Sequence, residues 1–238
     1  MRREHFEIRE TAVTLIAETE HIKVAKDAIF EARDIIEMKI AEDPFFQITY
    51  DPYRQSNNDD DLIKRMCQAS VLANVGPMAS VAGAVAVYAV ERMRDAGATY
   101  AVAENGGDIA ILADRPVLIG LYSGDPKLDT ISVRIPPSEN ITGVCSSSGR
   151  IGPSVSFGDS DISTVFSDDV ILADATATRL GNLTGSMTVS EAMETVGSIS
   201  GIKGCMIYRN STIGMFGDIP ELVKTHIPEK NITRILFS

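Results

Sequence analysis

The hydrophobic pattern of residues 1–53 predicts a β-hairpin followed by one long helix. Apolar and polar residues alternate over 5–18, with a polar break in the middle, as expected for two strands joined by a tight turn. Residues 20–41 carry apolar side chains at helical spacing and charged side chains on the opposite face, and Asp43-Pro44 ends this run. Residues 45–53 fit either a short strand or a packed loop.

Two further helices are predicted at 62–73 and 77–94. They are separated by Gly76-Pro77, and such a pair breaks one helix and starts the next. Charged residues are absent from 66–90, which is long enough to cross a membrane, since roughly 20 apolar residues suffice. The Gly-Pro break and two amide side chains within this stretch favour buried helices instead, so no membrane association is expected.

The rest of the chain contains short apolar runs that predict antiparallel strands. Asn105-Gly106-Gly107 lies between strands predicted at 99–103 and 108–112, and Asn-Gly between apolar runs is a strong hairpin signal. A helix is predicted at 190–199, with Ser190 as its N-cap. Further strands are predicted at 117–122, 131–135, 206–208, 212–216 and 232–237, with a turn at Asn210-Ser211.

This order of elements indicates the fold class. Hairpins and helices are mixed, without a regular alternation of strand and helix. The mixture favours an α+β fold, with a largely antiparallel sheet packed with helices, over a doubly wound parallel sheet. No linker rich in Pro, Gly or Ser divides the chain, so residues 1–238 are expected to form a single domain.

Charge and cysteine content restrict the partners. The net charge of -11 repels phosphate backbones, so no nucleic acid is expected as a partner. Three cysteines without a CxxC pair predict neither a disulfide framework nor a zinc site. The N-terminal segment is charged rather than apolar, unlike a signal peptide, so a cytoplasmic location is expected. The sequence leaves open whether the chain forms a homo-oligomer.

A carboxylate and a hydroxyl are predicted to share one helix face near the middle of the chain. Asp174 and Thr178 are four residues apart in a run of small residues, and residues at this spacing lie on one face of a helix. Both side chains offer hard oxygen ligands suited to Mg²⁺. Alternatively, Asp174 is the N-cap of this helix. Four aspartates precede the run and either attract the ion or solvate a loop; solvation is favoured: Asp159, Asp161, Asp168 and Asp169.

Two other segments are candidate phosphate-binding loops. Ser146-Ser147-Ser148 is followed directly by Gly149 and Arg150, and hydroxyls beside a guanidinium can hold a phosphate; the alternative is a plain polar loop. In Asn105-Gly106-Gly107-Asp108, consecutive glycines expose backbone N–H groups that can cradle a phosphate. A hairpin turn explains Asn105-Gly106 fully, but it does not explain the second glycine.

Together and in this order, these motifs resemble the FAD:protein FMN transferase family, also called the ApbE family. Asn105-Gly106-Gly107-Asp108 is identical to the glycine loop of that family, and Ser147-Ser148-Gly149 resembles its Thr-Ser-Gly. Ala173-Asp174-Ala175-Thr176-Ala177-Thr178 matches its Ala-Asp-Ala-x-(Ala/Ser)-Thr element. The resemblance covers roughly residues 76–217 and implies a T-fold-like α+β fold. It also implies that Asp174 and Thr178 bind Mg²⁺, assisted by a backbone carbonyl within 76–83.

The sequence departs from the transferases in two places. The family carries a His-x-x-Asp-Pro-x-Thr-Gly element between its last two motifs, whereas residues 152–158 contain no histidine and no Asp-Pro. The Lys-Gly pair and the acid that follows it in the family are also missing, and Gly83 lies near the position of that acid. The chain therefore resembles the smaller, uncharacterised ApbE-like group rather than the true transferases.

Three functions are compatible with the sequence. The first is an ApbE-like protein that binds a flavin, FAD or FMN, or another small phosphate-bearing ligand, together with Mg²⁺. The second is a transferase that attaches FMN to a protein threonine. The third is a non-catalytic accessory or structural protein that retains the fold. If the protein is an enzyme, a transferase-like, magnesium-dependent activity is expected, but no catalytic residue can be assigned.

Overall fold

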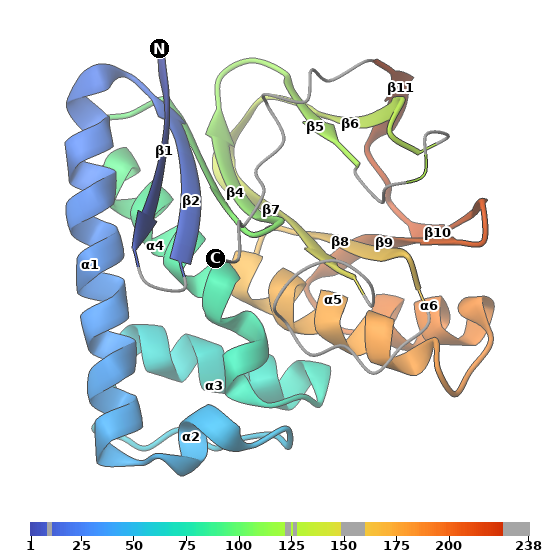
Figure 1. The fold of residues 1–238 in the computed structure, drawn as a ribbon, viewed down its shortest axis with the longest axis horizontal. Helices are drawn as coiled ribbons and strands as arrows, with labels where there is room; N and C mark the ends of the chain where they lie inside the picture. Colours follow the sequence, from blue (N-terminus) through green and yellow to red (C-terminus); the bar gives the residue numbers. More distant parts are fainter. Residues whose placement is uncertain (9–10, 122–124, 126–127, 149–159, 226–238) are drawn as a thin grey trace.

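An eight-stranded antiparallel sheet forms the centre of the protein (Figure 1). The computed structural model describes residues 1–8, 11–121, 125, 128–148 and 160–225. The strands follow one another across the sheet in the order β1 (Arg2–Ile8), β2 (Thr11–Ala17), β3 (Tyr100–Asn105), β4 (Asp108–Ala113), β7 (Ser138–Ser147), β8 (Ile162–Ser167), β9 (Ile202–Arg209) and β10 (Thr212–Gly217).

Helices cover one face of this sheet (Figure 1). Their apolar side chains form one hydrophobic cluster with every second residue of the strands, because side chains alternate between the two faces of a sheet. The helical segments are α1 (Thr19–Glu42), α2 (Phe45–Ile48), α3 (Asp61–Ala73), the 3-10 helix η1 (Pro77–Ser80), α4 (Val81–Asp95), α5 (Val170–Leu183) and α6 (Val189–Gly197).

A small second sheet packs on the opposite face. Its strands are antiparallel and lie in the order β11-β6-β5, with bounds β5 (Val117–Gly120), β6 (Ile131–Ile135) and β11 (Glu221–Lys224). The outward-facing residues of the large sheet pack against it and form a second hydrophobic cluster, which includes Phe166 and Tyr208. The central strands are therefore buried on both faces, and β4 and β8 have no exposed residue.

The elements with strong periodicity were predicted correctly. The hairpin expected at 5–18 is β1 and β2, the long helix at 20–41 is α1, and the helices at 62–73 and 77–94 are α3 and η1–α4. The α+β class with a largely antiparallel sheet is confirmed. The single domain over 1–238 stays a prediction.

Two local predictions were wrong, and one strand was missed. Residues 45–48 form the short helix α2 rather than a strand or loop, because Pro44 has a helical backbone conformation and Asp43 accepts a hydrogen bond from the Phe45 N–H at 3.0 Å. The N-cap of α6 is Thr188 rather than Ser190, since Thr188 and Glu191 form a capping box. Strand β11 was not predicted, and the strand predicted at 232–237 lies outside the described residues.

The central segment was also misread in part. The serines at 146 and 147 were interpreted as a polar loop, but they end strand β7. The acidic stretch was interpreted as one loop, but strand β8 lies between Asp161 and Asp168. Both strands are rich in Ser and Thr, and β8 is buried on both faces, so neither strand shows a clear alternating pattern.

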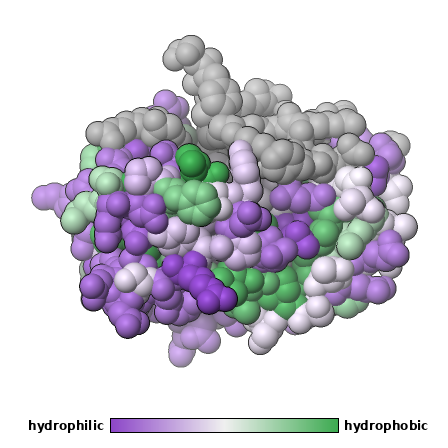
Figure 2. All heavy atoms as spheres, turned by 90° about the horizontal axis from the view of Figure 1, so that it is seen from below, coloured by the Kyte–Doolittle hydropathy of each residue, from purple (hydrophilic) through white to green (hydrophobic). Residues whose placement is uncertain are grey.

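The surface on the helical side is largely hydrophilic, with hydrophobic side chains in separate patches (Figure 2). Within the described part of the chain, no single helix is long and apolar enough to cross a membrane. Only α3 together with the η1–α4 segment reaches the required length, and these two are bent by 105° at their junction.

Candidate functional site

A row of cross-strand neighbours crosses the large sheet beneath the helices and contains three polar residues at its centre. Asn105 lies opposite Asp108, and Asp108 lies opposite Cys145. The row is apolar on either side, with Val13 next to Asn105 and Val165 next to Cys145. All three central side chains are buried on the face that the helices cover.

The β3–β4 turn places two of these side chains. Gly106 and Gly107 are its two central residues, with φ of 66° and 104°, as a tight two-residue hairpin turn of type I′ requires. This geometry explains the second glycine, because both turn positions need positive φ. Asn105 and Asp108 therefore face each other across the end of the hairpin, and both side chains point towards α4 and α5.

Asn105 uses its amide to hold the first turn of α4. Its Nδ2 donates a hydrogen bond to the carbonyl oxygen of Ala82 at 3.1 Å. The N-cap of α4, Ser80, makes no side-chain capping bond, so the first turn of α4 depends on groups from elsewhere in the chain. That Asn105 binds a cofactor stays a prediction; in the structure its Nδ2 contacts the protein backbone.

Asp174 lies on α5 and holds the same turn from the other side. Its Oδ2 accepts a hydrogen bond from the Gly83 N–H at 2.7 Å. The alternative that Asp174 caps its own helix was wrong, because Asp169 is the N-cap of α5 and accepts from the Leu172 N–H. A carboxylate at the N-terminus of α4 is favoured by the helix dipole, so Asp174 caps a neighbouring helix.

Gly83 is required by this close approach. A Cβ atom at position 83 would lie 2.9 Å from both the Asp174 Cβ and the Val170 carbonyl oxygen. Such a distance is shorter than side chains tolerate, so only glycine allows α4 and α5 to come this near. The sequence signal for this contact is the run of small residues from Ala79 to Ala86, which favours close packing but does not identify the partner helix.

The two carboxyl groups are strongly perturbed by burial. Burial raises the pKa of Asp174 to about 7, although the N–H groups of Gly83 and Ala82 act to lower it. Burial, and then the charge of Asp174, hold the pKa of Asp108 well above its usual range. Burial and both carboxylates likewise raise the pKa of the Cys145 thiol, which donates to the Val170 carbonyl oxygen.

The site lacks positive charge among the described residues. No Lys or Arg is among the main groups that act on the pKa of Asp108 or Asp174. The Oδ1 atom of Asp108 is buried and has no hydrogen-bond partner within the described part of the chain. Two buried carboxylates in this state are costly unless a cation accompanies them or they take up protons.

The donor set matches Mg²⁺ in kind but not in number. Thr178 lies one helical turn beyond Asp174 on α5 and is half-buried. Two carboxylates and one hydroxyl are hard oxygen donors, and Mg²⁺ is usually held by one or two carboxylates together with substrate phosphates. The described residues contain no cluster of three or more His, Cys, Asp or Glu side chains able to hold a metal. A complete site therefore needs oxygen atoms from elsewhere.

The predicted serine cluster is divided between the two faces of the sheet. Ser147 shares the face of Cys145 and lies opposite Ser163, and both are buried. Ser146 points to the other face, where its Oγ lies 2.9 Å from the Thr164 Oγ1. The Ser148 Oγ donates to the Asp161 carbonyl oxygen at 2.8 Å. Gly149 and Arg150, which were predicted to bind phosphate, lie outside the described residues.

The remaining predicted acids have structural roles. Asp169 caps α5, Asp168 pairs with Lys203, and Asp161 accepts a hydrogen bond from the Asn210 N–H at 3.0 Å. Asp159 lies outside the described residues. None of the three described acids is among the main groups that shift the pKa of Asp108 or Asp174.

A comparison with protein families shows to which family this chain belongs. A family model described as "AbpE bacteria" matches residues 1–195. The chain belongs to this family. Three similar relatives are all called UPF0280 protein. The relative from Methanosarcina acetivorans is 43% identical, and the match covers 98% of this chain and 93% of the relative. The relative from Methanothrix thermoacetophila is 45% identical, and the match covers 98% of this chain and 100% of the relative. The relative from Archaeoglobus fulgidus is 42% identical, with the same coverage of 98% and 100%.

Solved ApbE structures share the fold of this AbpE family member. The ApbE protein from Thermotoga maritima has a TM-score of 0.61 at 11% identity, covering 94% of this chain and 97% of its own. The flavin transferase ApbE from Vibrio cholerae has a TM-score of 0.55 at 12% identity, covering 90% and 96%. The predicted membership of an uncharacterised ApbE-like group is therefore confirmed, and at these identities the solved structures show the fold alone.

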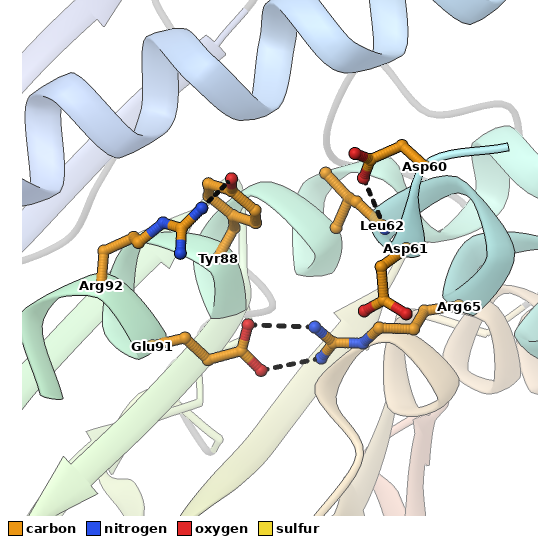
Figure 3. A pocket seen from close by; sticks show the side chains of 7 residues that line it. All are labelled: Asp60, Asp61, Leu62, Arg65, Tyr88, Glu91 and Arg92. Atoms are coloured by element: carbon orange, nitrogen blue, oxygen red, sulfur yellow. Dashed lines mark hydrogen bonds and ion pairs between the residues drawn. The ribbon is translucent and has the colours of Figure 1, made fainter. Parts of the chain in front are cut away.

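A separate open pocket of the AbpE family member lies away from this site. It has a volume of about 240 Å³ and lies between the N-terminus of α3 and the second half of α4 (Figure 3). Arg65 and Glu91 form a two-pronged ion pair across it at 3.0 and 2.9 Å, and Arg92 stacks over the Tyr88 ring. The Arg65–Glu91 pair joins α3 to α4, so we assign this pocket a structural role.

Proposed function

We propose that this protein binds a small phosphate-bearing molecule together with Mg²⁺, at the site formed by Asp108, Asp174 and Thr178. A flavin nucleotide, FAD or FMN, is the first candidate. The observation that carries the proposal is the unpartnered Oδ1 of Asp108 beside the buried carboxylate of Asp174. A divalent cation would supply the positive charge that these two side chains lack.

The arrangement supports a ligand that brings its own oxygen atoms. Three oxygen-bearing side chains leave coordination positions of a six-coordinate ion open for water and phosphate oxygens. In this role the protein residues bind the ion and orient it. The Gly83 and Ala82 N–H groups hold Asp174, and Asn105 holds the turn that carries these N–H groups. The choice of flavin rests on the printed names of the structural neighbours, several of which are flavin transferases.

The test is a binding screen with charge-removing variants. FAD, FMN and other nucleotides are titrated with and without Mg²⁺, and binding is followed by thermal shift and equilibrium dialysis. Asp174→Asn and Asp108→Asn keep the side-chain shape and should abolish the magnesium-dependent part of binding. The matched control is Asp168→Asn, an exposed carboxylate just before the same helix, which should bind like the parent.

Two outcomes would reject the proposal. One is that no phosphate-bearing ligand binds the parent protein in saturating Mg²⁺. The other is that Asp174→Asn binds such a ligand as tightly as the parent does under that condition. Mass spectrometry of a threonine-containing target peptide, incubated with FAD and the protein, separates covalent FMN transfer from binding alone.

A further inference from the structure

The two edges of the large sheet differ in charge. β1 is one edge, and its sequence RREHFEI carries five ionisable side chains. β10 is the other edge, and its sequence TIGMFG carries none. Charged residues on an edge strand oppose pairing with another strand, whereas an uncharged edge leaves its backbone N–H and C=O groups open to pairing. Within the described part of the chain, β10 pairs on one side only, with β9.

The large side chains of β10 are apolar and partly exposed. Gly214 faces α6, since a Cβ atom there would lie 3.0 Å from the Met193 side chain. By alternation Phe216 shares this face, and its ring lies over Gly197. Ile213 and Met215 point to the opposite face, and Met215 is 52% exposed. Large, partly exposed apolar side chains on an edge strand with no outer neighbour among the described residues are suited to contact with another chain.

The sequence of β10 is self-complementary. If two copies pair antiparallel about a two-fold axis at Gly214, Ile213 lies opposite Met215 of the partner subunit, and Thr212 lies opposite Phe216 of the partner subunit. Each cross-strand pair then places uncharged side chains opposite one another, so pairing of the two strands buries no charge. A chain with a net charge of -11 repels its own copies elsewhere, so an uncharged strand is the favourable point of contact.

The charges that flank the strand are complementary in the same arrangement. Asp218 is exposed and follows β10 directly, while Arg209, whose guanidinium also donates to the Thr184 carbonyl oxygen of its own chain, ends β9 at the other end of the hairpin. Antiparallel pairing brings the Asp218 end of one copy to the Arg209 end of the other, twice per dimer. Parallel pairing would instead bring the two Asp218 side chains together, which like-charge repulsion opposes.

From these observations we propose that β10 pairs with β10 of a second copy, so that two large sheets join into one continuous antiparallel sheet across a two-fold axis. This isologous interface lies at the opposite end of the sheet from β1. It is independent of the proposed ligand and of the carboxylate site.

The test is the oligomeric state of the full chain, measured by sedimentation velocity over a range of concentrations. Met215→Lys should raise the dimer dissociation constant by at least about tenfold, because each interface would enclose two ammonium groups. The matched control is Met38→Lys on α1, an even more exposed methionine at 72%, which should dimerise like the parent. Circular dichroism checks that both variants fold, as expected for exposed positions.

Three results would overturn the proposal: a parent that stays monomeric at the highest concentration, a Met215→Lys variant that dimerises like the parent, or equal loss of dimer in both variants. Pairing of β10 with a different protein predicts the first of these results.

Discussion

At the residue scale, Asp174 has two functions that set its chemistry. Its carboxylate closes the first turn of α4 through the Gly83 N–H, and it shares a buried site with Asp108. The capping role needs one oxygen atom and favours the charged form. Burial without a cation favours the neutral form, and this effect is the larger, because the pKa of Asp174 is raised to about 7.

This shift predicts how stability depends on pH without metal. The pKa of Asp174 rises from 3.8 to about 7 on folding, so the folded chain holds more protons than the unfolded chain between these values. The contribution of Asp174 to stability must therefore fall as the pH rises from about 4 to 7, by a few kcal/mol in order of magnitude. Urea unfolding in EDTA should show that Asp174→Asn gains stability over the parent across this window. A stability difference between Asp174→Asn and the parent that does not change with pH would contradict the raised pKa of Asp174.

Gly83 offers a second prediction at the residue scale. Gly83→Ala places a Cβ atom 2.9 Å from the Asp174 Cβ and the Val170 carbonyl oxygen, so α4 and α5 must separate. The expected loss is about 1–3 kcal/mol in the free energy of unfolding, as for other overpacked positions. Urea unfolding measures it. Ala79→Gly, in the turn before α4, gives the matched change of one methyl group, and an equal loss there would show that the contact between the helices is not the cause.

At the element scale, one buried ion pair fixes the segment between α1 and α3 to the end of α1. The Lys39 Nζ lies 2.7 Å from the Asp59 Oδ1, and both side chains are almost fully buried. Asp59 also accepts from the Ser56 N–H at 2.6 Å, and Lys39 lies over the Tyr53 ring. Burial acts to lower the pKa of Lys39, but its bonds to Asp59 outweigh this effect and raise it. The segment is therefore held to the end of α1 by a pair that needs both members.

We expect Lys39→Met to cost about 3–5 kcal/mol in the free energy of unfolding, because the Asp59 carboxylate then stays buried without a partner. The double variant Lys39→Met with Asp59→Leu should recover part of this loss, since no charge remains buried. Arg134→Ala, which breaks an exposed pair with Glu221, is the control and should change stability by less than about 1 kcal/mol. Equal losses in the free energy of unfolding for Lys39→Met and Arg134→Ala would show that burial of the ion pair does not matter.

At the scale of the whole molecule, periodicity determined what could be predicted. Amphipathic elements with one solvent-facing side, such as α1 and the edge strand β1, were predictable because their patterns have a single period. β8 was missed because it is buried on both faces and contains Ser and Thr, so neither alternation nor hydrophobicity marks it. The AbpE relationship followed from the order of short motifs, each of which was weak alone.

The site was only partly predictable for a related reason. Asp108 and Asp174 were selected by their motifs, and the structure brings both to one buried cluster. Two contacts depend on strand register, which a single sequence does not define. They are the hydrogen bond from Asn105 to the Ala82 carbonyl oxygen and the cross-strand pair of Asp108 and Cys145. Whether Ser147 and Ser148 take part in ligand binding stays a prediction.

The bond between Gly83 and Asp174 joins residues 91 positions apart in the chain, and this separation has a consequence for folding. The N-terminal part, up to the end of β4, contains Asn105, Asp108 and the first turn of α4, but its sheet neighbour β7 and the helix with Asp174 are made later. Closing so long a loop is slow and comes late in folding. Nascent or partly folded chains therefore lack the complete acidic cluster until α5 has docked.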